Sequence, residues 1–256
     1  MTKKNRVDLS RDEGMRQGAH KASGVVLRRK EGSVRSQELL LFLRTAGATW
    51  VGAPGATSTK NRFGGGIEPM VWGEYDLYQS PRRLYLKGVD VKEDFLQIRT
   101  SRRQLETAVR WCGELARRLP AGMENDALLS LLWGSMKNLR AGADPVLLDL
   151  RFAWRWANLW GLAPPLDFCV LCGRPLPGHD APDEGDVLLS RDGIVCAVCR
   201  GTVNYPALTI GSGELLFLIS ASTLPVEAFM AWQRESGSVF RDQSGVAAWL
   251  YSFLSV

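Results

Sequence analysis

The sequence predicts an α+β protein in which a small N-terminal antiparallel β-barrel precedes an α-helical bundle that is interrupted by a four-cysteine module. Three observations support this prediction. Short apolar runs alternate with polar residues early in the chain, helical spacing takes over near residue 101, and two C-x-x-C pairs follow. The expected partition is a disordered tail at 1–20, the barrel at 21–95, the helical part at 96–165 and 204–256, and the cysteine module at 166–203.

Alternating side chains define the expected barrel strands. Within residues 71–78, Tyr75 and Leu77 point to one side while Asp76 and Tyr78 point to the other. Turn signals separate further short apolar runs at 25–27, 39–43, 50–51 and 84–86. Five short strands within about 75 residues fit a closed antiparallel barrel, and an OB-like barrel is one such solution.

The helical part is predicted from spacing and caps. A capping box begins a helix at Ser101. Asp144 and Pro145 begin another, which is apolar nearly all round apart from Arg151 and Arg155. Such a helix is normally central in a bundle. Further helices are expected at 125–140, 213–221 and 240–254.

Four of the five cysteines form two matched knuckles. Cys169-x-x-Cys172 is followed by Gly173 and is separated by 23 residues, 173–195, from Cys196-x-x-Cys199. Four thiolates at this spacing suit one tetrahedral Zn²⁺ ion, and a hairpin-turn signal between the knuckles is typical of a zinc ribbon. Disulfides, a redox C-x-x-C and an iron–sulfur cluster are the alternatives. Because four thiolates fill the coordination sphere, we expect a structural ion rather than a catalytic one.

The remaining composition argues against an enzyme. The two histidines, His20 and His179, have no catalytic motif around them, and Gly64–Gly66 lacks the Lys-Ser/Thr of a phosphate-binding loop. The fifth cysteine, Cys112, lies on the apolar stripe of the first helix and is expected in the core. We therefore expect no catalytic residues.

The sequence also bears on location. The first twenty residues are polar and no run of eighteen apolar residues occurs, so we expect neither a signal peptide nor a membrane span. A cytoplasmic, nucleoid-associated location is expected, where reduced thiols favour metal binding over disulfides.

Charge is distributed unevenly along the chain. Residues 1–110 hold 21 Lys and Arg against 12 Asp and Glu, a net charge of +9, and the remainder carries −4, which together give the overall +5. The basic first part is the candidate contact for a polyanion, although solubility alone also explains basic segments.

The order of these parts resembles the RecO family of recombination mediators. The most specific match is the apolar helix 147–160, the Gly161-x-x-Pro164 exit that follows it, and the C-x-x-C-G-x-P-L run with its later C-x-x-C. Weaker matches are Gly24-Val-Val-Leu-Arg28, Gly55-Ala56 and Glu68-Pro69. The resemblance covers roughly residues 21–254 and includes the zinc-bearing type of this family.

The resemblance implies a non-catalytic mediator. Such proteins bind single- and double-stranded DNA, anneal complementary strands, act with RecR and bind the acidic C-terminal tail of single-strand DNA-binding protein, which lets RecA load. One departure concerns the loop 53–62, where Pro54 and Thr57 stand at positions that are basic in the family, while Lys60 and Arg62 remain.

Candidate contact residues follow from this reading. The basic candidates for DNA are Arg28, Arg29, Lys30, Arg35, Arg44, Lys60, Arg62, Arg82, Arg83 and Lys87. Trp72, Tyr78 and Tyr85 either stack on bases or pack the barrel, and packing is favoured. Arg151 and Arg155, beside apolar aromatic residues, fit the pocket that the family implies for the protein tail. The alternative is a zinc-ribbon scaffold that recruits proteins without direct DNA contact; a zinc hydrolase is disfavoured because no metal position is open.

Overall fold

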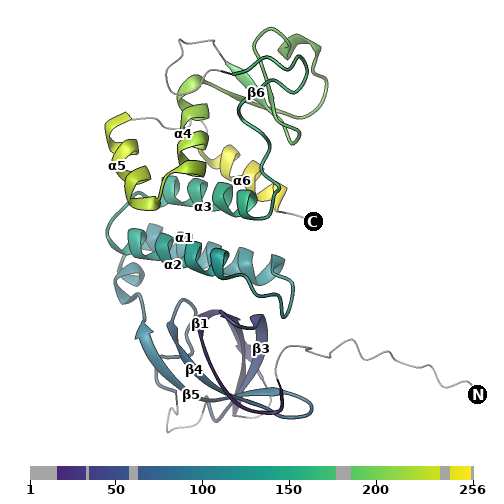
Figure 1. Ribbon diagram of the computed structural model, residues 1–256. Coiled ribbons are helices and arrows are strands. Elements are labelled where there is room, and N and C mark those ends of the chain that lie inside the picture. Colours follow the sequence, from purple (N-terminus) through teal and green to yellow (C-terminus); the bar gives the residue numbers. More distant parts are fainter. Residues whose placement is uncertain (1–15, 33–34, 58–62, 177–185, 237–242, 255–256) are drawn as a thin grey trace, which may run out of the picture. The chain divides into compact units, whose positions relative to one another are not determined.

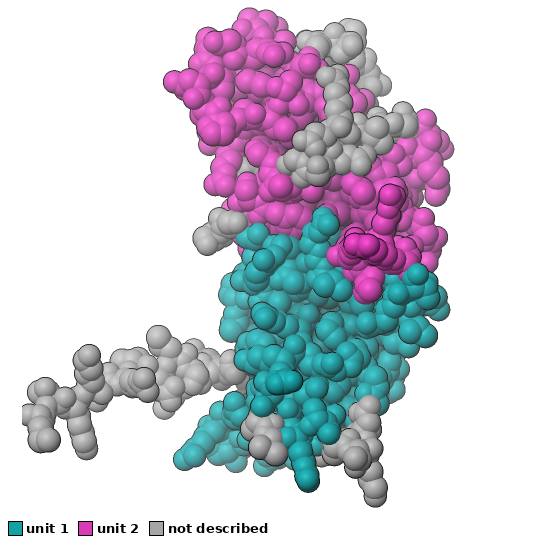
Figure 2. All heavy atoms as spheres, turned by 180° about the vertical axis from the view of Figure 1, so that it is seen from behind, with its two compact units in different colours: residues 1–100, 108–129 teal, residues 101–107, 130–256 magenta. Residues whose placement is uncertain are grey.

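The computed structural model describes residues 16–32, 35–57, 63–176, 186–236 and 243–254 (Figure 1). The predicted α+β organisation is confirmed, because a five-stranded barrel precedes the helices and a small sheet with four cysteines interrupts them. Contacts divide the chain into two compact units, residues 1–100 with 108–129 and residues 101–107 with 130–256 (Figure 2). The predicted domain limits at residues 95, 165 and 203 stay a prediction.

The barrel of the first unit is closed. Its strand order is β1-β2-β3-β5-β4, and every neighbouring pair is antiparallel except β3 and β5, which run parallel and meet at Gly52 and Tyr85. The strands are β1 (Gly18–Glu31), β2 (Ser36–Leu43), β3 (Gly47–Pro54), β4 (Trp72–Gln79) and β5 (Leu84–Glu93). The pairing of β3 with β5 closes the barrel.

One face of each strand fills the barrel core. The core contains Ala22, Val26, Leu39, Leu41, Leu43, Val51, Ala53, Tyr75, Leu77, Leu84 and Leu86. Complete burial of each large apolar side chain contributes roughly 1.5–3 kcal/mol. The Tyr75 hydroxyl donates to the Val71 carbonyl over 2.9 Å, and burial raises the pKa of Tyr75. The alternation predicted for residues 71–78 is thus confirmed for Tyr75 and Leu77.

The first strand begins earlier than predicted. β1 starts at Gly18, so the expected tail over 1–20 is wrong at its end, while residues 1–15 lie outside the described residues. Residues 18–25 pair antiparallel with residues 79–72 of β4. The ladder is supplied by a strand whose paired residues lie 47 to 61 positions later in the chain, which a short polar segment does not signal by itself.

A tight turn anchors the barrel to a later loop of the same unit. Gly47 has φ +59°, and a Cβ there would lie 2.1 Å from the Met123 carbonyl oxygen. The Gly122 amide donates to the Ala48 carbonyl over 3.1 Å. Gly47 is therefore required both by its backbone angle and by the close approach of the loop.

The helices lie close to their predicted positions. They are α1 (Arg102–Arg118), α2 (Asp126–Arg140), α3 (Pro145–Leu159), α4 (Ser212–Thr223), α5 (Val226–Ser236) and α6 (Gln243–Phe253), with short 3-10 helices at Leu96–Thr100 and Arg200–Thr202. Asp144 caps α3 as predicted, since its side chain accepts from the amides of Val146 and Leu147. Cys112 is buried, as predicted. None of the described helices is long and apolar enough to cross a membrane.

Helix α3 packs against α4 and α6 within the second unit. In the first half of α3, the buried Asp149 carboxylate accepts a hydrogen bond from the Tyr251 hydroxyl of α6 over 2.7 Å. Helix α5 was not predicted. It begins after Pro225, and its Phe229 ring lies 5.1 Å from that of Phe217 on α4 in an edge-to-face contact. So short a helix is marginal alone and depends on this packing.

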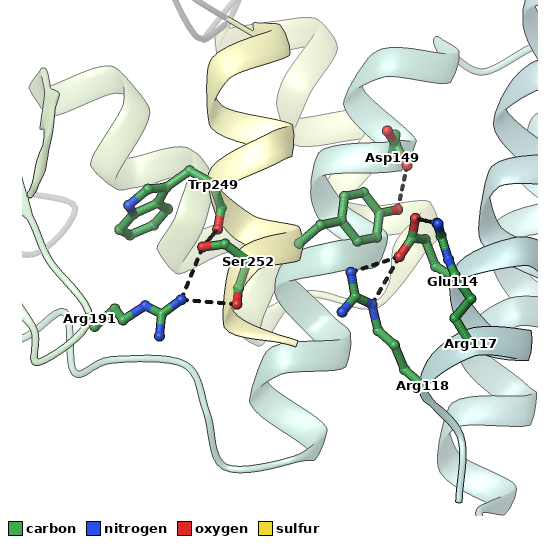
Figure 3. Close-up of polar contacts among 8 residues, drawn as sticks. Glu114, Arg117, Arg118, Asp149, Arg191, Trp249 and Ser252 are labelled. Carbon is green, nitrogen blue, oxygen red and sulfur yellow. Dashed lines mark hydrogen bonds and ion pairs between the residues drawn. The ribbon is translucent and has the colours of Figure 1, made fainter. Parts of the chain in front are cut away.

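The small sheet of the second unit contains three strands. They are β6 (Val187–Leu189), β7 (Ile194–Val195) and β8 (Leu208–Ile210), in the order β7-β6-β8. The predicted hairpin joins β6 to β7, and Gly193 in its turn has φ +147°. Arg191 lies in the same turn, and its guanidinium donates to the Ser252 carbonyl of α6 over 3.1 Å (Figure 3). The hairpin is thereby linked to the last helix.

Candidate metal centre and nucleic-acid interface

Two backbone knuckles present the four cysteines. In the first, the Gly173 amide donates to the Cys169 carbonyl over 2.8 Å, and Gly173 has φ +70°. In the second, the Arg200 amide donates to the Cys196 carbonyl over 3.0 Å. A β-bridge between Cys169 and Ile194 places the first knuckle beside β7, which leads into the second. The hairpin therefore brings two segments distant in sequence to one place.

The four sulfur atoms converge. The Sγ atoms of Cys169, Cys172, Cys196 and Cys199 all lie within 4.8 Å of one another, and those of Cys172 and Cys196 are 3.9 Å apart. Tetrahedral thiolates at the usual Zn–S length are separated by about 3.8 Å. The sulfurs are not joined as disulfides. This donor set could hold a metal ion.

Backbone amides favour a thiolate at the first cysteine. Burial raises the pKa of Cys169, but donors from Cys196, Cys172 and Leu171 outweigh burial and bring that pKa to about 6. The Cys196 amide itself donates to the Cys169 sulfur over 3.4 Å. Since a metal binds the thiolate rather than the thiol, the Cys169 sulfur is suited to a cation, whereas hydrogen bonds with Cys196 and Cys172 raise the pKa of Cys199.

Several predicted DNA-contact residues lie on the outer surface of the barrel. Arg28 is exposed on β1, and Arg35 is exposed in the turn before β2 with φ +59°. Arg82 is exposed in the turn between β4 and β5, and Lys87 is exposed on β5. Lys60 and Arg62 lie outside the described residues. Whether these residues contact DNA stays a prediction.

Other predicted contact residues are engaged with carboxylates of the first unit. Arg44 lies 3.2 Å from the Asp126 carboxylate and Arg83 lies 3.5 Å from that of Glu38, while Arg29 pairs with Glu68. All three pairs are at least partly exposed, so water and salt weaken them. Each pairing still reduces the positive charge that the arginine presents to a polyanion.

The aromatic candidates separate into two groups. Trp72 is buried, which fits the favoured packing role. Tyr78 is exposed and Tyr85 is half-buried, both on the outer face. Trp50, which was not among the predicted contact residues, is 40% exposed. Its signal was available in the sequence, because it stands one position before the core residue Val51 and so points outward.

The two arginines of α3 are directed at the end of α4. Arg151 is 4% exposed and donates to the Leu224 carbonyl over 3.0 Å, and Arg155 donates to the Ser222 carbonyl. These carbonyls have no partner within the helix, so cations stabilise them. Burial first, and then the charge of Arg155, lower the pKa of Arg151 to about 10. The predicted role of both arginines in partner binding stays a prediction.

A pocket of the second unit lies beside the carbonyl that Arg155 contacts, because Ser222 lines it, whereas neither arginine does. It has a volume of about 460 Å³. Its walls include Trp154 and Asn158 of α3, residues 163–167, and Ile219 and Ser222 of α4. The Trp154 ring nitrogen donates to the Ser222 hydroxyl over 2.6 Å, so this wall is held in place.

Glu114 illustrates how α1 is stabilised in the first unit. Its buried carboxylate accepts from Arg117 and from Arg118, one turn further along the helix (Figure 3). The single carboxylate offsets one of the two positive charges, and the Arg117 side chain remains 66% exposed, so positive charge is left on the surface of α1.

Comparison with known proteins finds sequences similar to this chain. A family model described as "Recombination protein O C terminal" matches residues 106–212. A DNA repair protein RecO of Exiguobacterium sp. is 27% identical over 177 residues, 69% of each chain. That of Rubrobacter xylanophilus is 26% identical over 81% of this chain and 82% of its own, and that of Thermobifida fusca is 24% identical over 92% of each.

Fold and site together define an α+β protein with a basic closed barrel, a helical part and a four-cysteine cluster able to hold a metal. The matched helices and cysteine knuckles are the segments on which the family model is placed. The chain is therefore similar to proteins of the RecO family.

Proposed function

We propose that the protein is a non-catalytic recombination mediator in DNA repair. It binds single- and double-stranded DNA, anneals complementary strands and, together with RecR, helps RecA to load on DNA covered by single-strand DNA-binding protein. Similarity to the RecO family supports this proposal, because the similar proteins are named DNA repair proteins. The protein acts in the cytoplasm, at the nucleoid.

The basic barrel is the proposed DNA-binding part. Backbone binding needs positive charge along the phosphates, and annealing needs that charge to screen two strands from each other. Arg28, Arg35, Arg82 and Lys87 supply it from exposed positions on strands and turns. No nucleophile or general base is required for either step.

The four-cysteine cluster is the proposed site of one structural Zn²⁺ ion. Zinc supplies four bonds that tie the two knuckles together, which replaces part of the core that so small a module lacks. Cys169 and Cys196 hold the ion from the buried side, and Cys172 and Cys199 from the solvent side. The residues around the cluster maintain this arrangement through the knuckle hydrogen bonds.

The proposed contact for the acidic tail of single-strand DNA-binding protein is the region of Arg151 and Arg155. The apolar pocket beside them supports this proposal, since an acidic, partly apolar peptide needs both a cation and a hollow. Arg155→Ala should weaken binding of the tail peptide, with exposed Arg174→Ala as the matched control. Equal affinity of the two variants would exclude this contact.

The alternative function is a scaffold that recruits proteins without touching DNA. Leu171 and Val198, at the tips of the two knuckles, are 50% and 72% exposed and favour a protein contact there. Anisotropy of a labelled single-stranded oligonucleotide, titrated with the full chain across a salt series, separates the two functions. Tight binding that weakens steeply with salt supports the mediator, and no binding even at low salt supports the scaffold.

A further inference from the structure

Three aromatic side chains point outward from the barrel, namely Trp50, Tyr78 and Tyr85. Each directly neighbours a buried core residue of its own strand, and neighbours along a strand point to opposite faces. Trp50 is 40% exposed, Tyr78 is 38% exposed, and Tyr85 is half-buried. Flat rings are therefore available on the outer surface rather than in the core.

These rings lie on three neighbouring strands. Tyr85 on β5 is in register with Tyr78 on β4 and with Gly52 on β3, and Trp50 is two residues from Gly52 on the same face. A Cβ at Gly52 would lie 3.4 Å from the Tyr85 ring, so this ring covers the bare backbone of β3. Since neighbouring strands are about 4.8 Å apart, the three rings occupy one region of the outer surface, here called the aromatic path Trp50–Tyr85–Tyr78.

Cations lie over both ends of the aromatic path. Lys30 Nζ is 4.1 Å from the centre of the Trp50 ring, and Lys87 Nζ is 5.2 Å from that of Tyr78. Arg28 is exposed on β1 and is level with Trp50 across the sheet, because Leu40 of β2 is in register with both residues. Each exposed ring therefore has a positive charge beside it.

Two carboxylates near the aromatic path are paired. Glu38 lies 3.5 Å from Arg83, and Asp76 lies 3.4 Å from Lys21. The surface around the rings thus keeps a positive balance. Flat apolar faces with adjacent cations match the two parts of a single-stranded nucleic acid, which are unpaired bases and phosphates. A duplex offers the phosphates but hides its base faces within its own stack.

We propose that the aromatic path is a stacking platform for unpaired bases of single-stranded DNA. A base takes the ring face that the lysine covers in the free protein, and the flexible lysine moves to the adjacent phosphate. This inference rests on the proposed DNA-binding function and adds the residues that hold the bases. It also gives the barrel a reason to prefer single strands over duplex.

The test compares two labelled oligonucleotides of equal length, oligothymidine and a fully abasic strand, which differ only in their bases. The full chain should bind oligothymidine more tightly than the abasic strand. Trp50→Ala should lower that preference about fivefold or more, because stacking on one ring contributes that much per base, while the salt dependence stays unchanged. Trp50→Phe should keep most of the preference.

Two controls keep the test decisive. Tyr205→Ala removes a ring that is 37% exposed but belongs to the other unit, and it should keep the full preference. Tyr78→Ala repeats the measurement at the other end of the aromatic path. Equal binding of both strands by the unmodified chain, or equal loss for both strands in the Trp50 and Tyr78 variants, overturns the platform while leaving DNA binding intact. No binding of either strand by the unmodified chain overturns the proposed function itself.

Discussion

Replacing Arg28 by alanine tests the charge part of DNA binding most directly. Arg28 is exposed on the barrel and, among the described residues, makes no ion pair, so its whole charge faces solvent. Arg44 provides the matched control, because its guanidinium lies 3.2 Å from Asp126 at similar exposure of the two partners, 56% and 55%. Both variants remove one positive charge, but only the first removes an unneutralised one.

The magnitude follows from counterion release. For a single strand, each neutralised phosphate contributes about 0.7 to the slope of log affinity against log salt. Arg28→Ala should therefore reduce the slope by about 0.7, which corresponds to about 2.6-fold less loss of affinity between roughly 50 and 200 mM salt. Arg44→Ala should change the slope by clearly less, because Asp126 already offsets its charge.

Anisotropy titrations at five or six salt concentrations measure both slopes. An unchanged slope in Arg28→Ala together with a reduced slope in Arg44→Ala would refute the argument from pairing. Circular dichroism of both variants controls for folding, which an exposed substitution should leave intact.

Three further predictions concern the metal, one turn and one buried thiol. Elemental analysis should find one zinc per chain, and a strong chelator should lower the melting temperature; metal-free protein with an unchanged melting temperature would contradict the structural ion. Gly47→Ala should lower the free energy of unfolding by more than about 2 kcal/mol, since strain at positive φ adds to the clash with the Met123 carbonyl. The control Gly122→Ala, at φ +72° with free space around the new Cβ, should cost only about 1–2 kcal/mol. Equal losses of the two variants in urea unfolding would exclude the clash. Burial raises the pKa of Cys112 to about 12, so the folded state retains the thiol proton. The contribution of this protonated thiol to stability is present below the unfolded pKa and is lost as pH rises from about 9 towards 12. Alkylation of Cys112 in native protein near pH 8 as fast as in unfolded protein would contradict this burial.

Much of the fold was predictable because its signals are local. The alternation of Tyr75 and Leu77, the cap at Asp144 and the knuckle glycine at Gly173 each depend on the backbone geometry of a few neighbouring residues. The cysteine spacing likewise predicted which sulfurs converge, since a C-x-x-C turn brings its two thiols together and a hairpin brings two such turns together.

Other features depended on contacts between distant segments. The start of β1 at Gly18 depends on pairing with β4, and helix α5 depends on the contact of Phe229 with Phe217. The burial of Arg151 depends on the carbonyl of Leu224, which lies 73 residues later in the chain. Nothing in the neighbouring residues signals these partners, so periodicity alone placed Arg151 on a polar stripe.

The candidate DNA surface shows the same division. By itself the sequence determined that the barrel segment is basic and contains aromatic residues that alternate with core residues. Only the tertiary structure decided that Trp72 is buried, that Trp50 is exposed beside Lys30, and that Arg44 is paired with Asp126. The physical reason is that composition and periodicity depend on each residue and its neighbours, whereas exposure and pairing depend on which strands and loops the closed barrel brings alongside.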